Sequence, residues 1–229
     1  MKLAVIPARG GSKRIPKKNI KLFRDKPIIA WSIIAAQKSK CFDKIIVSTD
    51  DDEIAKIATN YNAEVPFKRP KNFSDDTTPI LKVVSHAINW FNKKNIVFEN
   101  VCCIFPTAPF LEDIYIKKGL DILIKKNCDF TFSAMKNSYP IQRSFLINKK
   151  GYAQMIDKNN YFLRSQDLDD TYNDAGQFYW GKSSSWTKEK IIFDTNSIPI
   201  LLPLGKVHDI DTIEDWVYAE KLSYINDMI

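Results

Sequence analysis

KLAVIPARGGSKRIPKKN, residues 2–19, is the stretch of sequence that decides how this chain folds. Residues 2–6 are apolar after the first lysine, and such a short run predicts a buried strand. The adjacent glycines Gly10 and Gly11 follow closely, with five basic residues around them. In parallel α/β sheets ligands bind at the carboxyl ends of strands, so this turn lies where a ligand is expected.

Short apolar runs alternate with longer amphipathic segments from this stretch as far as Met135. Alternating strands and helices favour a mainly parallel sheet with helices on both faces, which is a Rossmann-like α/β fold. Three strand ends, at residues 7–9, 49–50 and 106–107, would then meet at one edge of the sheet. We predict strands at 2–6, 45–48, 101–105 and 129–133, and helices at 27–37, 52–61, 79–93 and 112–126.

The composition of the 229 residues, 45% hydrophobic and 27% charged, fits one globular domain spanning residues 1–229. The formal charge of +7 fits a nucleic-acid surface, a site for small polyanions, or simple solubility. No apolar run is long enough to span a bilayer, and the first residues do not resemble a signal peptide. The cysteines lack paired spacing, which indicates free thiols and a cytoplasmic protein; they are Cys41, Cys102, Cys103 and Cys128.

Residues 137–174 break the alternation, because they are polar, rich in aromatic residues and without a clear period. We interpret this segment as a small inserted arm rather than a second core. Exposed aromatic side chains on the arm would form a subunit interface in a homodimer. The alternative is a long irregular loop that packs on its own domain.

The glycine turn has the chemistry of a phosphate-binding site. Residues without a Cβ let the backbone approach an anion, and converging backbone N–H groups can donate to its oxygens. Arg9, Lys13 and Lys18 can neutralise several phosphate charges. The P-loop and dinucleotide patterns do not fit, because each needs a further glycine that is missing. A tight turn with solvated lysines is the structural alternative, and the basic residues around the glycines favour phosphate binding over it.

Two aspartates two positions apart, Asp209 and Asp211, form a second candidate site near the end of the chain. On an extended segment both side chains would point to one face, with about 6–7 Å between their Cα atoms. Two carboxylates there suit Mg²⁺, which prefers oxygen ligands and usually bridges substrate phosphates. Alternatively, Asp209 ends a strand and Asp211 helps to cap the helix that Thr212 begins, with Asp215 in a capping-box position.

Residues 7–19 resemble the signature of the acylneuraminate cytidylyltransferases, which reads PARGGSK-x-IP-x-KN. The match is nearly free of gaps, and the DID at residues 209–211 matches the family's metal-binding segment in order and distance. The resemblance implies a nucleotidyltransferase fold and transfer from CTP, with Mg²⁺ as the cofactor on Asp209 and Asp211. It implies a nucleotide site of Ala8, Arg9, Gly10, Gly11, Ser12, Lys13, Lys18, Asn19 and Arg69, with Arg9, Lys13 and Asp211 as catalytic residues.

AGQFYWG, residues 175–181, looks like the matching segment of the pseudaminic acid cytidylyltransferases of bacteria that glycosylate flagella. This resemblance covers essentially the whole chain. Phe105 and Leu111 replace the glutamine and arginine that lie toward the sugar pocket in sialic acid enzymes, which favours a sugar with fewer hydroxyl groups. The resemblance implies a sugar site of Phe105, Arg164, Gln166, Gln177 and Tyr179, with Arg164 and Gln166 on the inserted arm.

The remaining aromatic and histidine residues of interest have structural interpretations. Phe178 and Trp180 are expected in the core, and His86 in a helix without a chemical role. Whether His208 takes part in the metal site stays open, as does the number of Mg²⁺ ions.

The predicted reaction joins CTP and pseudaminic acid, an acidic nine-carbon sugar, to give CMP-pseudaminic acid and diphosphate. The anomeric hydroxyl attacks the α-phosphorus in line, and catalysis comes from positioning and electrostatics. N-acetylneuraminate, legionaminate and deoxyoctulosonate are the nearest alternative sugars. A nicotinamide oxidoreductase and a basic nucleic-acid-binding protein are alternatives of another class. The missing third glycine and the clustering of basic residues at one turn weigh against them, so we expect no nucleic-acid and no membrane partner.

Overall fold

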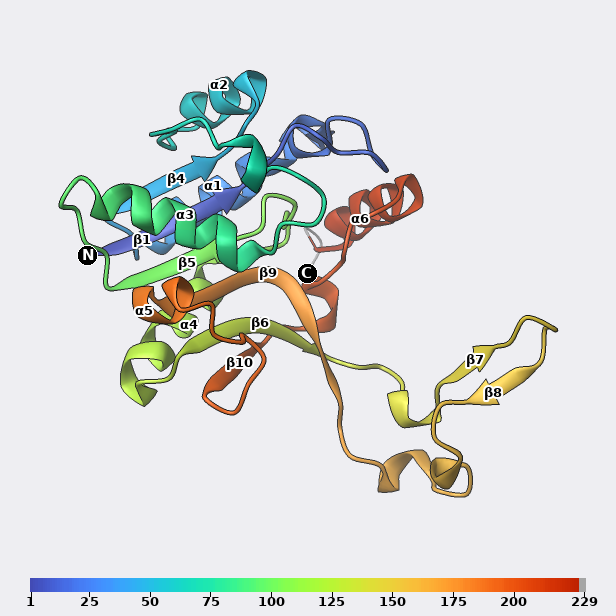
Figure 1. The fold of residues 1–229 in the computed structure, drawn as a ribbon. Coiled ribbons are helices and arrows are strands. Elements are labelled where there is room, and N and C mark those ends of the chain that lie inside the picture. The colour runs from blue at the N-terminus through green and yellow to red at the C-terminus, as the bar shows by residue number, and fades with distance from the viewer. Residues whose placement is uncertain (227–229) are drawn as a thin grey trace.

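The computed structural model describes residues 1–226, in which six strands form one central sheet (Figure 1). All neighbouring strands are parallel except where β9 is one of the pair, so the predicted mainly parallel sheet is confirmed. The four predicted strands are present with small shifts at their ends. In their order across the sheet, the strands are β10 (Ser197–Leu201), β6 (Phe130–Lys136), β9 (Tyr172–Lys182), β5 (Asn100–Ile104), β1 (Lys2–Pro7) and β4 (Lys44–Ser48).

The strand β9 runs antiparallel between β5 and β6, and the alternation of the sequence did not predict it. Tyr179 pairs with Cys103 on one side and with Phe132 on the other. Because both faces of the strand are covered over most of its length, its side chains do not alternate between apolar and polar. Its first residues belong to the predicted insert 137–174, but Asp174 pairs with Ala134 of β6.

Helices cover both faces of the sheet, as predicted (Figure 1). Successive residues of β1 point to opposite faces: Ala4 and Ile6 pack with α1, α2 and α4, whereas Leu3 and Val5 pack with α3 and α5. All four of these β1 side chains are fully buried. The helices are α1 (Ile28–Ser39), α2 (Asp52–Asn60), α3 (Ile80–Asn92), α4 (Asp113–Lys126), α5 (Ser183–Thr187) and α6 (Ile213–Asn226).

The last helix, α6, packs against the glycine turn and not against the sheet. Its Trp216 shares a small apolar cluster with Ile15, from the basic turn, and with the buried Ile210. Thr212 and Asp215 form the expected capping box: the Asp215 N–H donates to the Thr212 hydroxyl at 3.2 Å, and the Thr212 N–H donates to the Asp215 carboxylate at 2.8 Å. The basic turn and the last helix, far apart in the sequence, therefore lie next to each other.

Residues 137–171 leave the sheet between β6 and β9 and extend away from the body of the molecule (Figure 1). They contain a small hairpin of β7 (Phe145–Ile147) and β8 (Ala153–Met155). Aromatic side chains on this arm are exposed, with Phe162 at 89% and Tyr139 at 84%. That the arm forms a subunit interface stays a prediction.

The four cysteines are free thiols, of which Cys41 is half-buried and the other three are buried. Burial raises the pKa of the Cys103 thiol, so this side chain is an inert part of the core. Within residues 1–226, no helix combines the length and the hydrophobicity that crossing a membrane requires.

Candidate active site

Hydrogen bonds from several neighbouring groups fix the glycine turn at the end of β1. Asp50, just after β4, accepts from the Gly10 N–H at 3.1 Å. The buried Asn19 donates its side-chain amide to the Arg9 carbonyl at 2.9 Å. Ala8 is fully buried and its N–H donates to the Ser48 carbonyl at 3.0 Å, so its side chain belongs to the core. Bonds within the chain therefore fix the backbone of the turn.

The two glycines of the turn differ in their surroundings. A Cβ on Gly10 would lie 2.6 Å from the Asp51 carboxylate, whereas a Cβ on Gly11 would meet nothing within 4 Å. Asp51 is the N-cap of α2 and accepts from the N–H groups of Glu53 and Ile54 at 2.8 and 2.9 Å. Gly10 is thus required for packing the turn on α2, while Gly11 leaves its backbone open to solvent.

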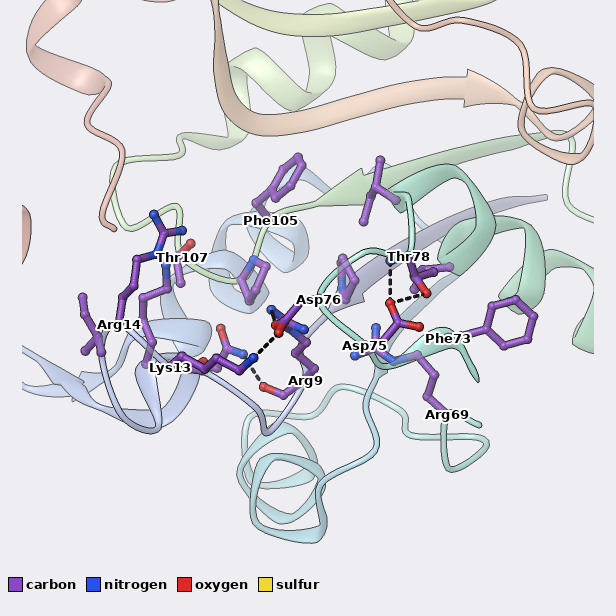
Figure 2. A pocket seen from close by; sticks show the side chains of 18 residues that line it. Arg9, Lys13, Arg14, Arg69, Phe73, Asp75, Asp76, Thr78, Phe105 and Thr107 are labelled. Carbon is purple, nitrogen blue, oxygen red and sulfur yellow. Dashed lines mark hydrogen bonds and ion pairs between the residues drawn. The ribbon is translucent and has the colours of Figure 1, made fainter. Parts of the chain in front are cut away.

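A cavity of about 550 Å³ lies beside the turn, at the carboxyl ends of β1 and β5 (Figure 2). Its walls come from the basic turn, from the loop of residues 69–78 and from the segment that follows β5. Of the predicted nucleotide-binding residues, the cavity is lined by Arg9, Ser12, Lys13, Lys18, Asn19 and Arg69, and not by Ala8, Gly10 or Gly11. The structure therefore brings residues from distant parts of the sequence to one concave site.

Two of the basic side chains in this cavity converge on one carboxylate. Arg9 forms an ion pair with Asp76 at 2.5 Å, and Lys13 contacts the other oxygen of the same carboxylate (Figure 2). The pKa of Asp76 lies below its usual value, mainly because Lys13 and then Arg9 donate to it. A group that binds Arg9 and Lys13 together must therefore replace this carboxylate.

The second acidic candidate, Asp211, lies against the other side of the basic turn. The Arg14 guanidinium donates two parallel hydrogen bonds to its carboxylate, both of 2.8 Å. Lys18 donates to the Ile210 carbonyl at 2.6 Å and lies 3.5 Å from the Asp211 carboxylate. Asp209 and Asp211 do not line the cavity, but Arg14 and Lys18, which contact Asp211, do.

Arg69 is the most deeply buried charged residue of the site, at 4% exposure. Its Nε donates to the Ser74 hydroxyl at 3.2 Å, and its Nη2 lies 3.9 Å from the Asp50 carboxylate. Burial lowers the pKa of the guanidinium, and the Asp50 charge opposes that shift. An arginine held this way connects the loop of residues 69–78 to the end of β4 and presents a fixed positive charge to the cavity.

Of the predicted sugar-binding residues in or next to the sheet, Phe105 lines the cavity, whereas Gln177 and Tyr179 are buried and do not line it. Phe105 lines the cavity and packs edge-on against Tyr179, with 5.1 Å between ring centroids. Tyr179 is buried behind it and donates its hydroxyl to Asp174; burial, and then Asp174, raise the pKa of this phenol. Gln177 is buried as well and donates to the Lys206 carbonyl at 2.6 Å. Leu111 was expected to lie toward the sugar, but it packs in the core with α4 and does not line the cavity.

The two arm residues of the predicted sugar site do not reach the cavity of their own chain. Arg164 and Gln166 are exposed, and Arg164 pairs with Asp167 at 2.7 Å. They could act on a sugar only if the arm were to contact another site, for example that of a second subunit.

The acidic segment at residues 209–211 is the predicted Mg²⁺ site. Ile210 is buried, so its neighbours Asp209 and Asp211 flank it on the outward side of the segment. Within residues 1–226, no group of three or more histidine, cysteine or acidic residues could hold a metal ion. Two carboxylates are donors of the kind that Mg²⁺ takes, since this ion keeps several waters and binds substrate phosphates. Both oxygens of Asp211 accept from Arg14 at 2.8 Å, so the ion would have to replace that pair, and the Mg²⁺ site stays a prediction.

The structure adds site residues that sequence reasoning did not assign. By its local sequence Asp76 has the pattern of an ordinary turn residue, and the sequence assigns Arg14 no role of its own. Arg14 carries a local signal, since it lies within the basic turn. The contact of Asp76 with Arg9 and Lys13 depends on how the loop of residues 69–78 folds over the turn.

A family profile described as cytidylyltransferase matches residues 3–202, which is most of the chain. This chain belongs to the cytidylyltransferase family. The glycine turn and the cavity residues from Arg9 to Thr107 all lie inside the matched range. Membership favours nucleotidyl transfer over the oxidoreductase and nucleic-acid-binding alternatives.

Named relatives of this cytidylyltransferase agree with the family. A pseudaminic acid cytidylyltransferase of Campylobacter jejuni is 44% identical over 224 residues, covering 98% of this chain and 97% of the relative. A CMP-N,N'-diacetyllegionaminic acid synthase of Legionella pneumophila is 32% identical over 234 residues, covering 98% and 97%. The solved CMP:2-keto-3-deoxy-manno-octonic acid synthetase complexed with CTP has a TM-score of 0.71 at 13% identity, covering 98% of this chain and 99% of that one. The last comparison confirms the predicted nucleotidyltransferase fold.

Proposed function

We propose that this cytidylyltransferase transfers CMP from CTP to pseudaminic acid, with release of diphosphate. The observation that carries the proposal is the 44% identity, over nearly the full length of both chains, to a protein named for this activity. The cavity supports it independently, because a basic glycine turn meets the apolar Phe105 in one concave site. Legionaminic acid is the second candidate sugar, since the 32% identical relative is named for a diacetylated form of it.

In this proposal, different residues of the cavity bind the phosphates, the cytidine and the sugar. Arg9, Ser12 and Lys13 bind the β- and γ-phosphates, and Lys18 and Asn19 complete the nucleotide site. Arg69 encloses the cytidine side, fixed there by Ser74 and Asp50. Phe105 forms the apolar wall for the sugar, backed by Tyr179. The charges of the turn thus face the polyphosphate, and the apolar wall faces the deoxygenated part of the sugar.

The chemical step is a displacement at the α-phosphorus. The anomeric oxygen of the sugar forms a bond to this phosphorus and loses its proton to solvent, while the bond to the β-phosphate oxygen breaks. Arg9 and Lys13 bind the departing diphosphate and stabilise the charge that develops on it. Mg²⁺ bound by Asp209 and Asp211 would supply further positive charge for the phosphates. The protein contributes positioning and charge, without a covalent intermediate.

The arm supports a further part of the proposal, that the enzyme is a homodimer. The exposed aromatic residues of the arm need a partner surface, and Arg164 and Gln166 do not reach the cavity of their own chain. In a dimer the aromatic residues of the arm would be buried against the partner subunit. Arg164 and Gln166 would then reach the partner's cavity. We also propose a cytoplasmic location, where free thiols such as those of this chain stay reduced.

The test is release of diphosphate from CTP and Mg²⁺ with each of four sugars. The panel contains pseudaminic, legionaminic, N-acetylneuraminic and deoxyoctulosonic acids, and kcat/KM is compared among them. Pseudaminic acid is expected to give the largest value. A larger value with legionaminic acid would replace the sugar and keep the reaction, whereas no release with any sugar would overturn the proposal.

A further inference from the structure

The basic residues of the glycine turn are paired with carboxylates of the chain itself. These carboxylates come from three separate parts of the chain, namely the loop before α3, the segment before α6 and the first turn of α2. The pairs are Arg9 and Lys13 with Asp76, Arg14 and Lys18 with Asp211, and Lys17 with Glu53. The chain therefore supplies its own anions to the cations of the turn.

Asp76 differs from the other two carboxylates because it lines the cavity itself. One of its oxygens lies 2.5 Å from Arg9 Nη2, and the other contacts Lys13 Nζ. One anionic group that bridges two cations of a glycine turn is the arrangement expected for a phosphate. In Figure 2, Arg9 and Lys13 point toward Asp76 from the same turn.

The loop that carries Asp76 is held by bonds that do not involve Asp76. The neighbouring Asp75 accepts from the N–H groups of Thr77 and Thr78 at 2.8 and 2.7 Å, and these bonds lower its pKa to about 2. Ser74 accepts from Arg69 and donates to the Pro70 carbonyl at 3.1 Å. The hydrogen bonds of Asp75 and Ser74 thus hold the loop in the conformation that places the Asp76 carboxylate. A substitution of Asp76 leaves those hydrogen bonds intact.

We propose that Asp76 is a resident counter-anion that competes with polyphosphate for Arg9 and Lys13 and thereby promotes release of the diphosphate product. The inference rests on the proposed function for its biological meaning, but not for its test. On substrate binding, phosphate oxygens replace the carboxylate on the two cations. When diphosphate leaves, the carboxylate returns to them, so neither cation is left without a partner.

The exposure of the three groups makes this exchange energetically easy. The side chains of Arg9, Lys13 and Asp76 are 33%, 80% and 43% exposed. Ion pairs this accessible to water contribute little stability, so a multiply charged phosphate can replace the carboxylate. Because the Asp76 carboxylate still competes for Arg9 and Lys13, the affinity of the turn for polyphosphate is lower. Lower affinity favours release of the diphosphate product and so favours turnover.

The test measures binding of inorganic tripolyphosphate and inorganic diphosphate to the full chain by calorimetry. Asp76→Asn keeps the shape of the side chain and removes its charge, and its dissociation constants are expected to fall by roughly 3- to 30-fold. Asp76→Glu keeps the charge and is expected to bind nearly as the wild type does. Glu53→Gln is the matched control: it removes one negative charge from the partner of Lys17, and neither residue lines the cavity.

The outcomes separate this inference from the proposed function. Tighter binding by Asp76→Asn alone supports the inference, and inhibition of CMP-sugar formation by diphosphate at lower concentrations supports its role in product release. Equal tightening by Glu53→Gln would reduce the effect to general electrostatics and overturn the inference. Unchanged or weaker binding by Asp76→Asn, with normal CMP-sugar formation by the wild type, overturns the inference and leaves the proposed function intact. No sugar activity combined with tighter tripolyphosphate binding overturns the proposed function alone.

Discussion

Arg14 and Asp211 are joined by two parallel hydrogen bonds of 2.8 Å each, although 197 positions separate them in the sequence. This bidentate pair fastens the acidic segment to the basic turn, with Ile15, Ile210 and Trp216 forming the apolar cluster beneath it. The turn proposed to bind the polyphosphate and the segment proposed to bind the metal are therefore one structural unit.

Replacing Asp211 by alanine is expected to lower kcat by roughly 100-fold, because a charge-stabilising group at the transferring phosphate is lost. Affinity for CTP is expected to stay the same or to rise slightly, since Arg14 and Lys18 lose a competing carboxylate. Steady-state kinetics and CTP titration separate these effects. Glu214→Gln, an exposed substitution in the first turn of α6, is the control. Near-normal turnover in Asp211→Ala would contradict the metal assignment.

The two glycines of the turn are expected to respond differently to alanine. Gly10→Ala forces a Cβ to 2.6 Å from the Asp51 carboxylate, which must then release its cap on α2. We expect a loss of about 1 kcal/mol in the free energy of unfolding, typical of a lost helix cap, together with weaker CTP binding. Gly11→Ala has open space and should fold normally. Urea unfolding and CTP titration test both variants, and equal stability of the two would show that the contact with Asp51 does not constrain the turn.

Phe105 is expected to select the sugar through its apolar surface. Phe105→Gln introduces an unpaired polar group into the wall that Tyr179 supports, and kcat/KM for pseudaminic acid should fall by roughly 10-fold or more. The ratio of activity with N-acetylneuraminic acid to activity with pseudaminic acid should rise. Phe193→Leu is a suitable control, because Phe193 contacts Tyr179 at 6.0 Å between centroids but does not line the cavity. An unchanged ratio in Phe105→Gln would place the sugar elsewhere.

Asp129 is expected to make the stability of the fold depend on pH in the acid range. Its carboxylate accepts from Lys190, Ser185 and Asn196, and these bonds, those from Lys190 above all, lower its pKa to about 2. A lowered pKa in the folded state means that the stabilisation is complete above the unfolded pKa, near 3.8, and is lost as the pH falls through about 2.

Asp129→Asn should therefore lower the free energy of unfolding at pH 7 by about 1–3 kcal/mol and flatten its pH dependence between about pH 4 and pH 2. Chemical unfolding at a series of pH values measures both effects, with the exposed Asp121→Asn as the control. The same pH dependence in wild type and Asp129→Asn would assign the acid sensitivity to other groups.

The arm is expected to hold a dimer together through its aromatic residues. Light scattering should give a molar mass of twice 26.4 kDa for the wild type, and a double variant Tyr161→Ser, Phe162→Ser should shift the mass toward the monomer. Ile114→Ser, which replaces an exposed apolar residue on α4, should leave the dimer intact. A monomeric wild type would contradict the homodimer outright.

Local patterns in the sequence were sufficient to predict most of the fold. The alternation of strands and helices is set by neighbours along the chain, so it predicted β1, β4, β5 and β6 and four helices close to their observed bounds. It could not predict β9, because that strand is buried on both faces and is defined by its pairing with β5 and β6. A strand covered on both faces lacks the alternation of apolar and polar residues from which a strand is predicted.

The sequence by itself determined that two glycines and five basic residues lie close together after the first strand, and from them it predicted a phosphate-binding turn. Only the tertiary structure decided which charges face one another. Arg14 meets Asp211 because α6 packs back on the turn, and Asp76 meets Arg9 and Lys13 because the loop of residues 69–78 is anchored over the cavity. Contacts between residues this far apart depend on how helices and loops pack on the sheet. No local spacing encodes that packing, so these ion pairs became visible only in the folded chain.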